Sequence, residues 1–125
     1  MAVSGQAEPR EDVEQAALIR WAEYSRAAHP ELKLLLHIPN GGLRGKAEAG
    51  RFKTLGVKAG VPDLFLPVAR GKAHGLWVEM KRVHSGKVSA AQKGWLAALR
   101  AQGYEAIVCH GWVEASEQIL KYLAQ

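Results

Sequence analysis

Apolar residues recur at helical spacing near the start of the chain and again in its second half. From Glu11 to Ala28 they follow a helical period with acidic residues in the first turn, and His29-Pro30 ends the pattern. Residues 89–102 begin with a capping-box pattern and stop at Gly103. Residues 114–123 form a last amphipathic stretch. The expected inward-facing positions are Val13, Ala17, Leu18, Trp21 and Tyr24 in the first helix, and Ile119, Leu120 and Leu123 in the last.

Four shorter apolar runs have the length of strands. They cover residues 32–38, 63–68, 76–81 and 104–109. Residues 69–75, between the second and third runs, carry glycine and lysine as a hairpin loop does. Residues 46–55 are predicted to form a basic helix with Gly56 as its C-cap.

The resulting order of elements is α-β-α-β-β-α-β-α. It predicts an α/β fold with a small mixed β-sheet flanked by helices on both faces. The runs 76–81 and 104–109 are separated by a helix, so they should be parallel neighbours. Residues 1–10 are polar and are expected to form a disordered leader, and residues 11–125 to form a single domain.

Acidic residues stand at the ends of two neighbouring predicted strands. Pro62-Asp63 opens one strand, and Glu79 and Lys81 close the next. Alternate residues of a strand share a face, so Glu79 and Lys81 point the same way, and Asp63 can reach the same place. Two carboxylates, with the backbone carbonyl of Met80, suit a divalent cation, and Lys81 suits the attacking water of a nuclease. The alternative is a solvent-facing strand with a weak surface ion pair.

Two polar residues lie on otherwise apolar helix faces. Glu14 shares its face with Leu18 and Trp21, which makes it a candidate third carboxylate over the metal. Stabilisation of the helix dipole explains Glu14 equally well. Gln92 is expected to point inward and to bond Lys81 or a phosphate, and a capping role is the competing explanation.

Charge and composition narrow the class of protein. The net charge is +5 and the pI about 9.6, which suits a polyanionic partner. Basic residues gather on both sides of the predicted carboxylates, where they would draw phosphates toward an acidic site. The candidate DNA contacts are Asn40, Arg44, Lys46, Arg51, Lys53, Lys58 and Lys87. The competing explanations are a plain turn around Asn40 and solvated surface charge elsewhere.

Several classes of protein are disfavoured. The single cysteine, Cys109, lies in an apolar run, which excludes a disulfide framework and a cysteine-rich zinc site. No apolar stretch is long enough to span a membrane, and residues 1–12 lack the apolar core of a signal peptide. A cytoplasmic protein, in a bacterial cell or a phage-infected host, is therefore expected.

Together these motifs resemble a known family, the virus-type replication-repair nuclease (VRR-NUC) domain of the PD-(D/E)xK nuclease superfamily. The motifs are Asn40-Gly41-Gly42, the stretch from Gly56 to Asp63, Trp77-Val78-Glu79-Met80-Lys81, Ser89 and Gln92 with Trp95, and Gly103-Tyr104. Each is short, but their joint order and spacing are specific, and the similarity runs from about residue 11 to residue 123.

The resemblance implies a restriction-endonuclease-like core and Mg²⁺- or Mn²⁺-dependent cleavage of DNA. By position, Asp63, Glu79 and Lys81 match the catalytic triad of the family, Glu14 its acidic residue on the first helix, and Gln92 its glutamine. The chain resembles the minimal stand-alone form of phages and bacteria, which implies a homodimer that acts on branched DNA such as Holliday junctions or flaps in replication, recombination or repair.

Two other functions are compatible with the same residues. One is a catalytically silent nucleic-acid-binding module of the same fold, which would bind DNA without cutting it under any divalent ion. The other is a phosphatase or nucleotidase, which would prefer mononucleotides to duplex DNA.

Overall fold

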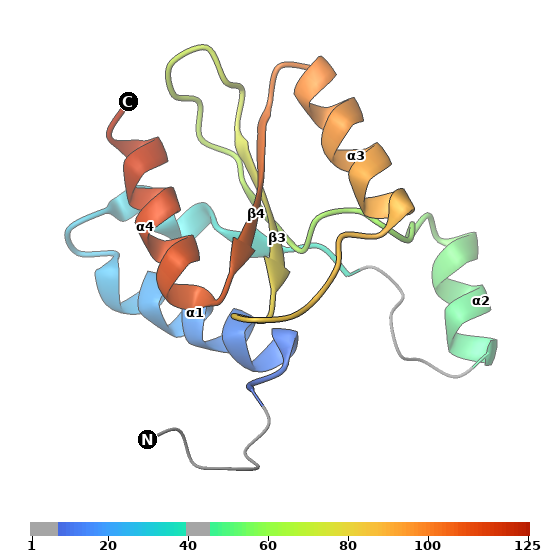
Figure 1. Ribbon diagram of the computed structural model, residues 1–125. Helices are drawn as coiled ribbons and strands as arrows, with labels where there is room; N and C mark the ends of the chain where they lie inside the picture. Colours follow the sequence, from blue (N-terminus) through green and yellow to red (C-terminus); the bar gives the residue numbers. More distant parts are fainter. Residues whose placement is uncertain (1–7, 40–45) are drawn as a thin grey trace.

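A four-stranded mixed sheet forms the centre of the molecule (Figure 1). The computed structural model describes residues 8–39 and 46–125. The strands lie in the order β1 (Leu36–His37), β2 (Leu64–Leu66), β3 (Leu76–Lys81) and β4 (Glu105–His110). The first two pairings are antiparallel and the pairing of β3 with β4 is parallel. The predicted order of elements, the mixed sheet and the hairpin between β2 and β3 are confirmed.

Helices cover both faces of this sheet. Helices α1 (Glu11–Ser25) and α4 (Trp112–Leu123) pack together on one face, and α3 (Ala90–Ala101) packs against β4 on the other (Figure 1). Helix α2 (Lys46–Thr54) stands beside this body, on the same side as α3. The capping box predicted for α3 is present. No helix in the two described segments is long and apolar enough to cross a membrane.

The alternation of side chains along β3 divides the molecule into a core and a site. Leu76, Val78 and Met80 are fully buried in the apolar core between the sheet and helices α1 and α4. The intervening residues Glu79 and Lys81 face the opposite side, where α3 lies. Charged groups are thus kept out of the main core although both side chains are buried.

The apolar run predicted as the first strand is mostly not a strand. Residues Pro30–Leu34 form a 3₁₀ helix, and only Leu36–His37 pair with β2. Proline at the first helical position has a φ suited to a helical turn, which explains the change. Leu32 from this turn is buried beside α1.

The first helix is shorter than predicted, and part of its face assignment was wrong. Helix α1 ends at Ser25 rather than Ala28. Val13 is 48% exposed and Tyr24 is 93% exposed, so neither belongs to the core. The other boundaries shift slightly: the predicted strands 63–68 and 104–109 are Leu64–Leu66 and Glu105–His110, the predicted helices 46–55 and 89–102 are Lys46–Thr54 and Ala90–Ala101, and the last helix begins at Trp112 rather than at residue 114.

Candidate active site

Asp63 and Glu79 come together from two neighbouring strands. Asp63 immediately precedes β2, whose antiparallel register sets Leu64 opposite Val78. The Asp63 Oδ2 atom accepts a hydrogen bond from the Met80 backbone N–H at 2.7 Å. The charge of Asp63 and a side-chain hydrogen bond with it both act on Glu79. The two carboxyl groups therefore share one place on one face of the sheet.

Glu79 is an acid whose negative charge is costly in the absence of a cation. Its side chain is 3% exposed. Burial, the neighbouring charge of Asp63 and their hydrogen bond raise the pKa of Glu79 to about 8, although Lys81 acts in the opposite direction. Its Oε1 atom is buried and has no hydrogen-bond partner among the described residues. A buried carboxylate oxygen without a donor is a position where a cation would be stabilising.

Lys81 reaches the same place from the end of β3. Its Nζ atom donates a hydrogen bond to Gln92 Oε1 at 3.0 Å and lies 3.8 Å from Glu79 Oε2. Its side chain is 6% exposed. Gly86, with a φ of +96°, passes over the lysine stem, where an added Cβ would lie 3.3 Å from Lys81 Cδ. The ammonium is thus held against the carboxylate pair.

Gln92 fulfils both of the roles that the sequence left open. Its side-chain oxygen accepts from the Ser89 backbone N–H at 2.8 Å, and its own N–H donates to Ser89 Oγ at 3.1 Å, which completes the capping box. The same oxygen accepts from Lys81, and the side-chain nitrogen donates to Glu79 Oε2 at 2.9 Å. The start of α3 therefore orients both catalytic candidates.

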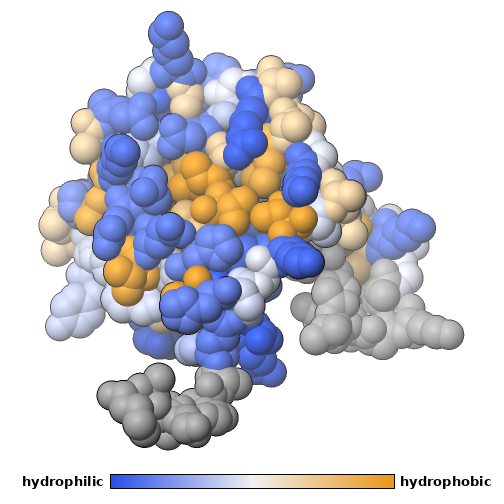
Figure 2. Space-filling view, in the orientation of Figure 1, coloured by the Kyte–Doolittle hydropathy of each residue, from blue (hydrophilic) through white to orange (hydrophobic). Residues whose placement is uncertain are grey.

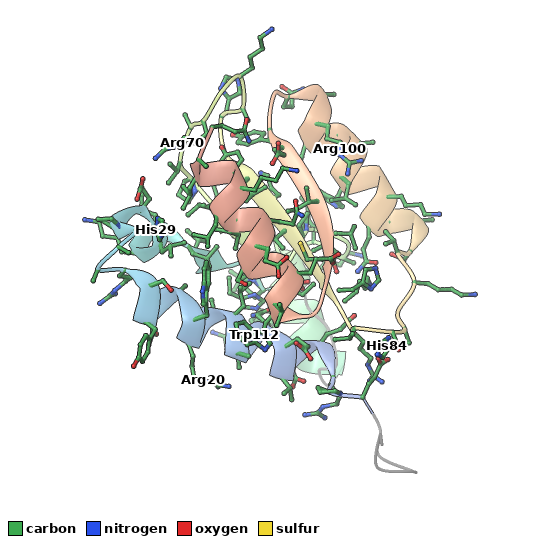
Figure 3. All side chains as sticks on the ribbon, turned by 60° about the vertical axis from the view of Figure 1, so that its left-hand side comes forward. Arg20, His29, Arg70, His84, Arg100 and Trp112 are labelled. Carbon is green, nitrogen blue, oxygen red and sulfur yellow. The ribbon has the colours of Figure 1, made fainter. Side chains whose placement is uncertain are left out.

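Glu14 has a different partner from these residues. It is buried on α1, but its Oε1 atom accepts from the Trp112 backbone N–H at 2.9 Å, at the start of α4. Figure 3 shows Trp112 where α4 meets α1. A carboxylate at a helix N-terminus is stabilised by the exposed N–H groups there. The structure thus gives Glu14 a capping partner on α4, and its role toward a metal stays a prediction.

Two acids that the sequence reasoning did not select lie closer to Lys81 and its loop. Glu11 Oε1 is 3.6 Å from Lys81 Nζ. The carboxylate of Glu8 accepts from the His84 backbone N–H at 2.8 Å and from the Ser85 hydroxyl, so the segment before α1 is joined to the loop that follows Lys81 (Figure 3). Their position in the first turn suggested only a helix start, because their partners lie more than 65 residues away in sequence.

The predicted DNA contacts are partly described. Arg51 and Lys53 on α2 are exposed, and so are Lys58 and Lys87 in the loops before Asp63 and before α3. Asn40, Arg44 and the side chain of Lys46 lie outside the described residues. The four described cations are free to meet solvent on the side of the sheet that carries α2 and α3.

The donor set suits a hard divalent cation. In residues 8–39 and 46–125, no group of three or more His, Cys, Asp or Glu side chains is arranged to hold a metal ion. The carboxylate pair of Asp63 and Glu79 remains, and Mg²⁺ typically takes one or two carboxylates and completes its shell with waters and phosphate oxygens. The unpartnered Glu79 Oε1 supports this fit. The Met80 N–H points toward Asp63, and the carbonyl of an extended residue points the same way, as predicted for a third oxygen.

The raised pKa of Glu79 predicts how the stability of the metal-free protein depends on pH. The folded protein holds this proton up to about pH 8, whereas the ordinary value is 4.5. The resulting stabilisation is complete below about pH 4.5 and is lost as the pH rises through about 8. In EDTA, the melting temperature should therefore fall between these pH values, and Mg²⁺ should restore it at pH 8.

Two variants test this pH dependence. Glu79→Gln should flatten the change of melting temperature with pH, since the amide does not titrate. Glu117→Gln removes an exposed carboxyl from α4 and should leave the change as in the parent. An unaltered pH dependence in Glu79→Gln would assign the effect to another group.

Comparison with known proteins places this arrangement in context. The family model described as VRR-NUC domain matches residues 9–112. A solved structure described as "VRR_NUC domain protein" superposes with a TM-score of 0.80 and 31% sequence identity, over 94% of this chain and 91% of that chain. No curated protein matches this chain.

Proposed function

Because this chain belongs to the VRR-NUC family, a nuclease-type domain, we propose that it is a Mg²⁺- or Mn²⁺-dependent endonuclease that hydrolyses phosphodiester bonds in structured DNA. Holliday junctions and flaps formed in replication, recombination or repair are the proposed substrates, and the PD-(D/E)xK superfamily is the proposed wider relationship. The observation that carries the proposal is the buried pair of Asp63 and Glu79, with one unpartnered oxygen, beside Lys81.

The residues of the site divide the chemistry between them. Asp63 and Glu79 would hold the cation, which when bound neutralises charge on the phosphate and activates a water. Lys81 donates to the attacking water or to the phosphate oxygens, where negative charge grows in the transition state. Gln92 holds Glu79 and Lys81 in register from the start of α3. Site and substrate are both acidic, so the flanking cations must supply the attraction.

A panel of DNA substrates tests the proposal. Linear, flap and four-way DNA should be bound in Ca²⁺ and cut in Mg²⁺ or Mn²⁺, with the branched substrates cut faster than linear duplex. Binding without cutting under every divalent ion would favour the silent module. Preference for mononucleotides would favour a phosphatase or nucleotidase.

The basic face of α2 is expected to contact the phosphate backbone without reading bases. Arg51→Glu should weaken binding to all sequences about equally and reduce the salt dependence of log K by about one unit per lost contact. The measurement is a salt titration of affinity in Ca²⁺ with two unrelated sequences. The matched control is Lys121→Glu, an exposed position on α4, across the sheet from α2 (Figure 1). A sequence-selective loss, or an equal loss in the control, would contradict backbone contact by α2.

The proposed enzyme acts as a homodimer, so that two sites can cut two strands of a branched substrate. One surface supports this proposal. Apolar residues gather over the edge strand β4, between α3 and α4, with polar side chains around them (Figure 2). Arg100 donates to the Ala106 carbonyl at one end of this edge, and Glu114 accepts from the His110 N–H at the other. Antiparallel copies would set Arg100 of each against Glu114 of the other. The mass in solution should then correspond to two chains.

A further inference from the structure

The ammonium group of Lys81 has three acceptors that differ in their freedom to move. It bonds Gln92 Oε1 at 3.0 Å and lies 3.8 Å from Glu79 Oε2 and 3.6 Å from Glu11 Oε1. The side chain of Glu79 is 3% exposed and is held by Gln92. The side chain of Glu11 is 42% exposed. Glu11 is therefore the partner on the solvent side of the lysine.

The turn that carries Glu11 allows its side chain to leave. Arg10, the N-cap of α1, makes no side-chain cap bond, and its guanidinium pairs on the surface with Asp12 at 3.2 Å. In the described part of the chain, the recorded side-chain contact of Glu11 is its ion pair with Lys81. Rotation of Glu11 would thus break that pair and leave the helix in place.

A substrate phosphate needs the position that Glu11 holds. The ammonium of Lys81 has three N–H donors, and each has an acceptor nearby. A phosphodiester oxygen approaching from solvent is anionic, so it competes with the nearest exposed carboxylate for the lysine. Gln92 and Glu79 are fixed by each other, which leaves Glu11 as the group to be exchanged.

We propose that the Glu11 carboxylate occupies the phosphate subsite: the scissile phosphate displaces it and takes over its ion pair with Lys81. This inference rests on the proposed function, since it requires that Lys81 meets a phosphodiester. No covalent bond changes in the exchange. Glu11 acts as an internal competitor that lowers affinity for any DNA whose phosphate reaches Lys81.

The subsite differs from the role that family resemblance assigns to an acid of the first helix. A metal-binding carboxylate would raise the affinity for cations, and its loss would slow cutting. A competitor lowers the affinity for DNA, and its loss would tighten binding. The two roles therefore predict effects of opposite sign on binding.

The test compares two neighbouring charge-removing variants with and without the lysine. Affinity for a flap substrate is measured in Ca²⁺ for Glu11→Gln and for Asp12→Asn, each in the parent and in the Lys81→Ala background. Asp12 is 69% exposed and pairs only with Arg10 among its recorded ion pairs, so it reports the general effect of one lost negative charge. Release of Arg10 would by itself favour DNA, which makes this a stringent control.

Glu11→Gln should tighten binding about two- to fivefold more than Asp12→Asn, the range expected for breaking a partly exposed ion pair. The difference should vanish in the Lys81→Ala background. Equal effects of the two variants, or a difference that persists without Lys81, would overturn the subsite. A loss of Mn²⁺ affinity in Glu11→Gln, measured by calorimetry, would overturn it in favour of a metal ligand. A parent protein that neither binds nor cuts DNA would instead refute the proposed function itself.

Discussion

The Lys81→Ala variant should bind DNA in Ca²⁺ and fail to cut it in Mg²⁺ or Mn²⁺. Lys81 is the cation placed beside the carboxylate pair, at 3.8 Å from Glu79. Loss of one preorganised donor to a developing negative charge typically costs about 10²–10³-fold in rate, and here the donor carries a full charge. Binding should survive with at most the loss of one phosphate contact, because exposed cations on α2 and the loops supply the others.

Two further variants separate chemistry from folding. Lys81→Met keeps an unbranched stem under Gly86 and should also be inactive, with a melting temperature near that of the parent. Lys121→Ala removes an exposed lysine from α4 and should cut at the parent rate. Cleavage by Lys81→Ala at the parent rate would show that the assignment of roles is wrong.

Asp63→Asn should show a large loss of activity together with a gain in stability. An asparagine has nearly the same shape and can still accept the Met80 N–H, so the loop geometry should be kept. Loss of the charge should lower metal affinity and cut the rate by more than the roughly 10–100-fold typical of an outer-shell partner. Without metal, the same change removes repulsion with Glu79, so the melting temperature in EDTA at pH 8 should rise.

Calorimetry with Mn²⁺, rate measurements and thermal melts check this combination in one set of proteins. Asp12→Asn, the same chemical change at an exposed position, should leave metal affinity and melting temperature close to those of the parent. A variant Asp63→Asn that binds Mn²⁺ as tightly as the parent would contradict the shared metal site.

Strand periodicity was the strongest source of correct prediction. The bounds of β3 agree with the apolar run at residues 76–81, and its alternation correctly placed Glu79 and Lys81 on one face. Adjacent strands joined by a short hairpin then brought Asp63 to the same place. These relations are local or nearly so, which is why sequence alone was enough.

Other features depend on packing between distant segments. Helical spacing puts Glu11 and Glu14 one turn apart, and it does not tell which of them meets the end of β3. The structure joins Glu11 to Lys81 and Glu14 to the start of α4, more than 65 residues away in each case. The exposed Val13 and Tyr24 show the same limit, because an apolar position becomes core only where another element covers it.

The most direct test of the central claim is anomalous diffraction from crystals soaked in Mn²⁺. The shared carboxylate site predicts a peak within bonding distance of both Asp63 and Glu79, on the face of the sheet that carries α3, with Lys81 beside it. A peak elsewhere on a saturated crystal, with no density between these two carboxylates, would contradict it.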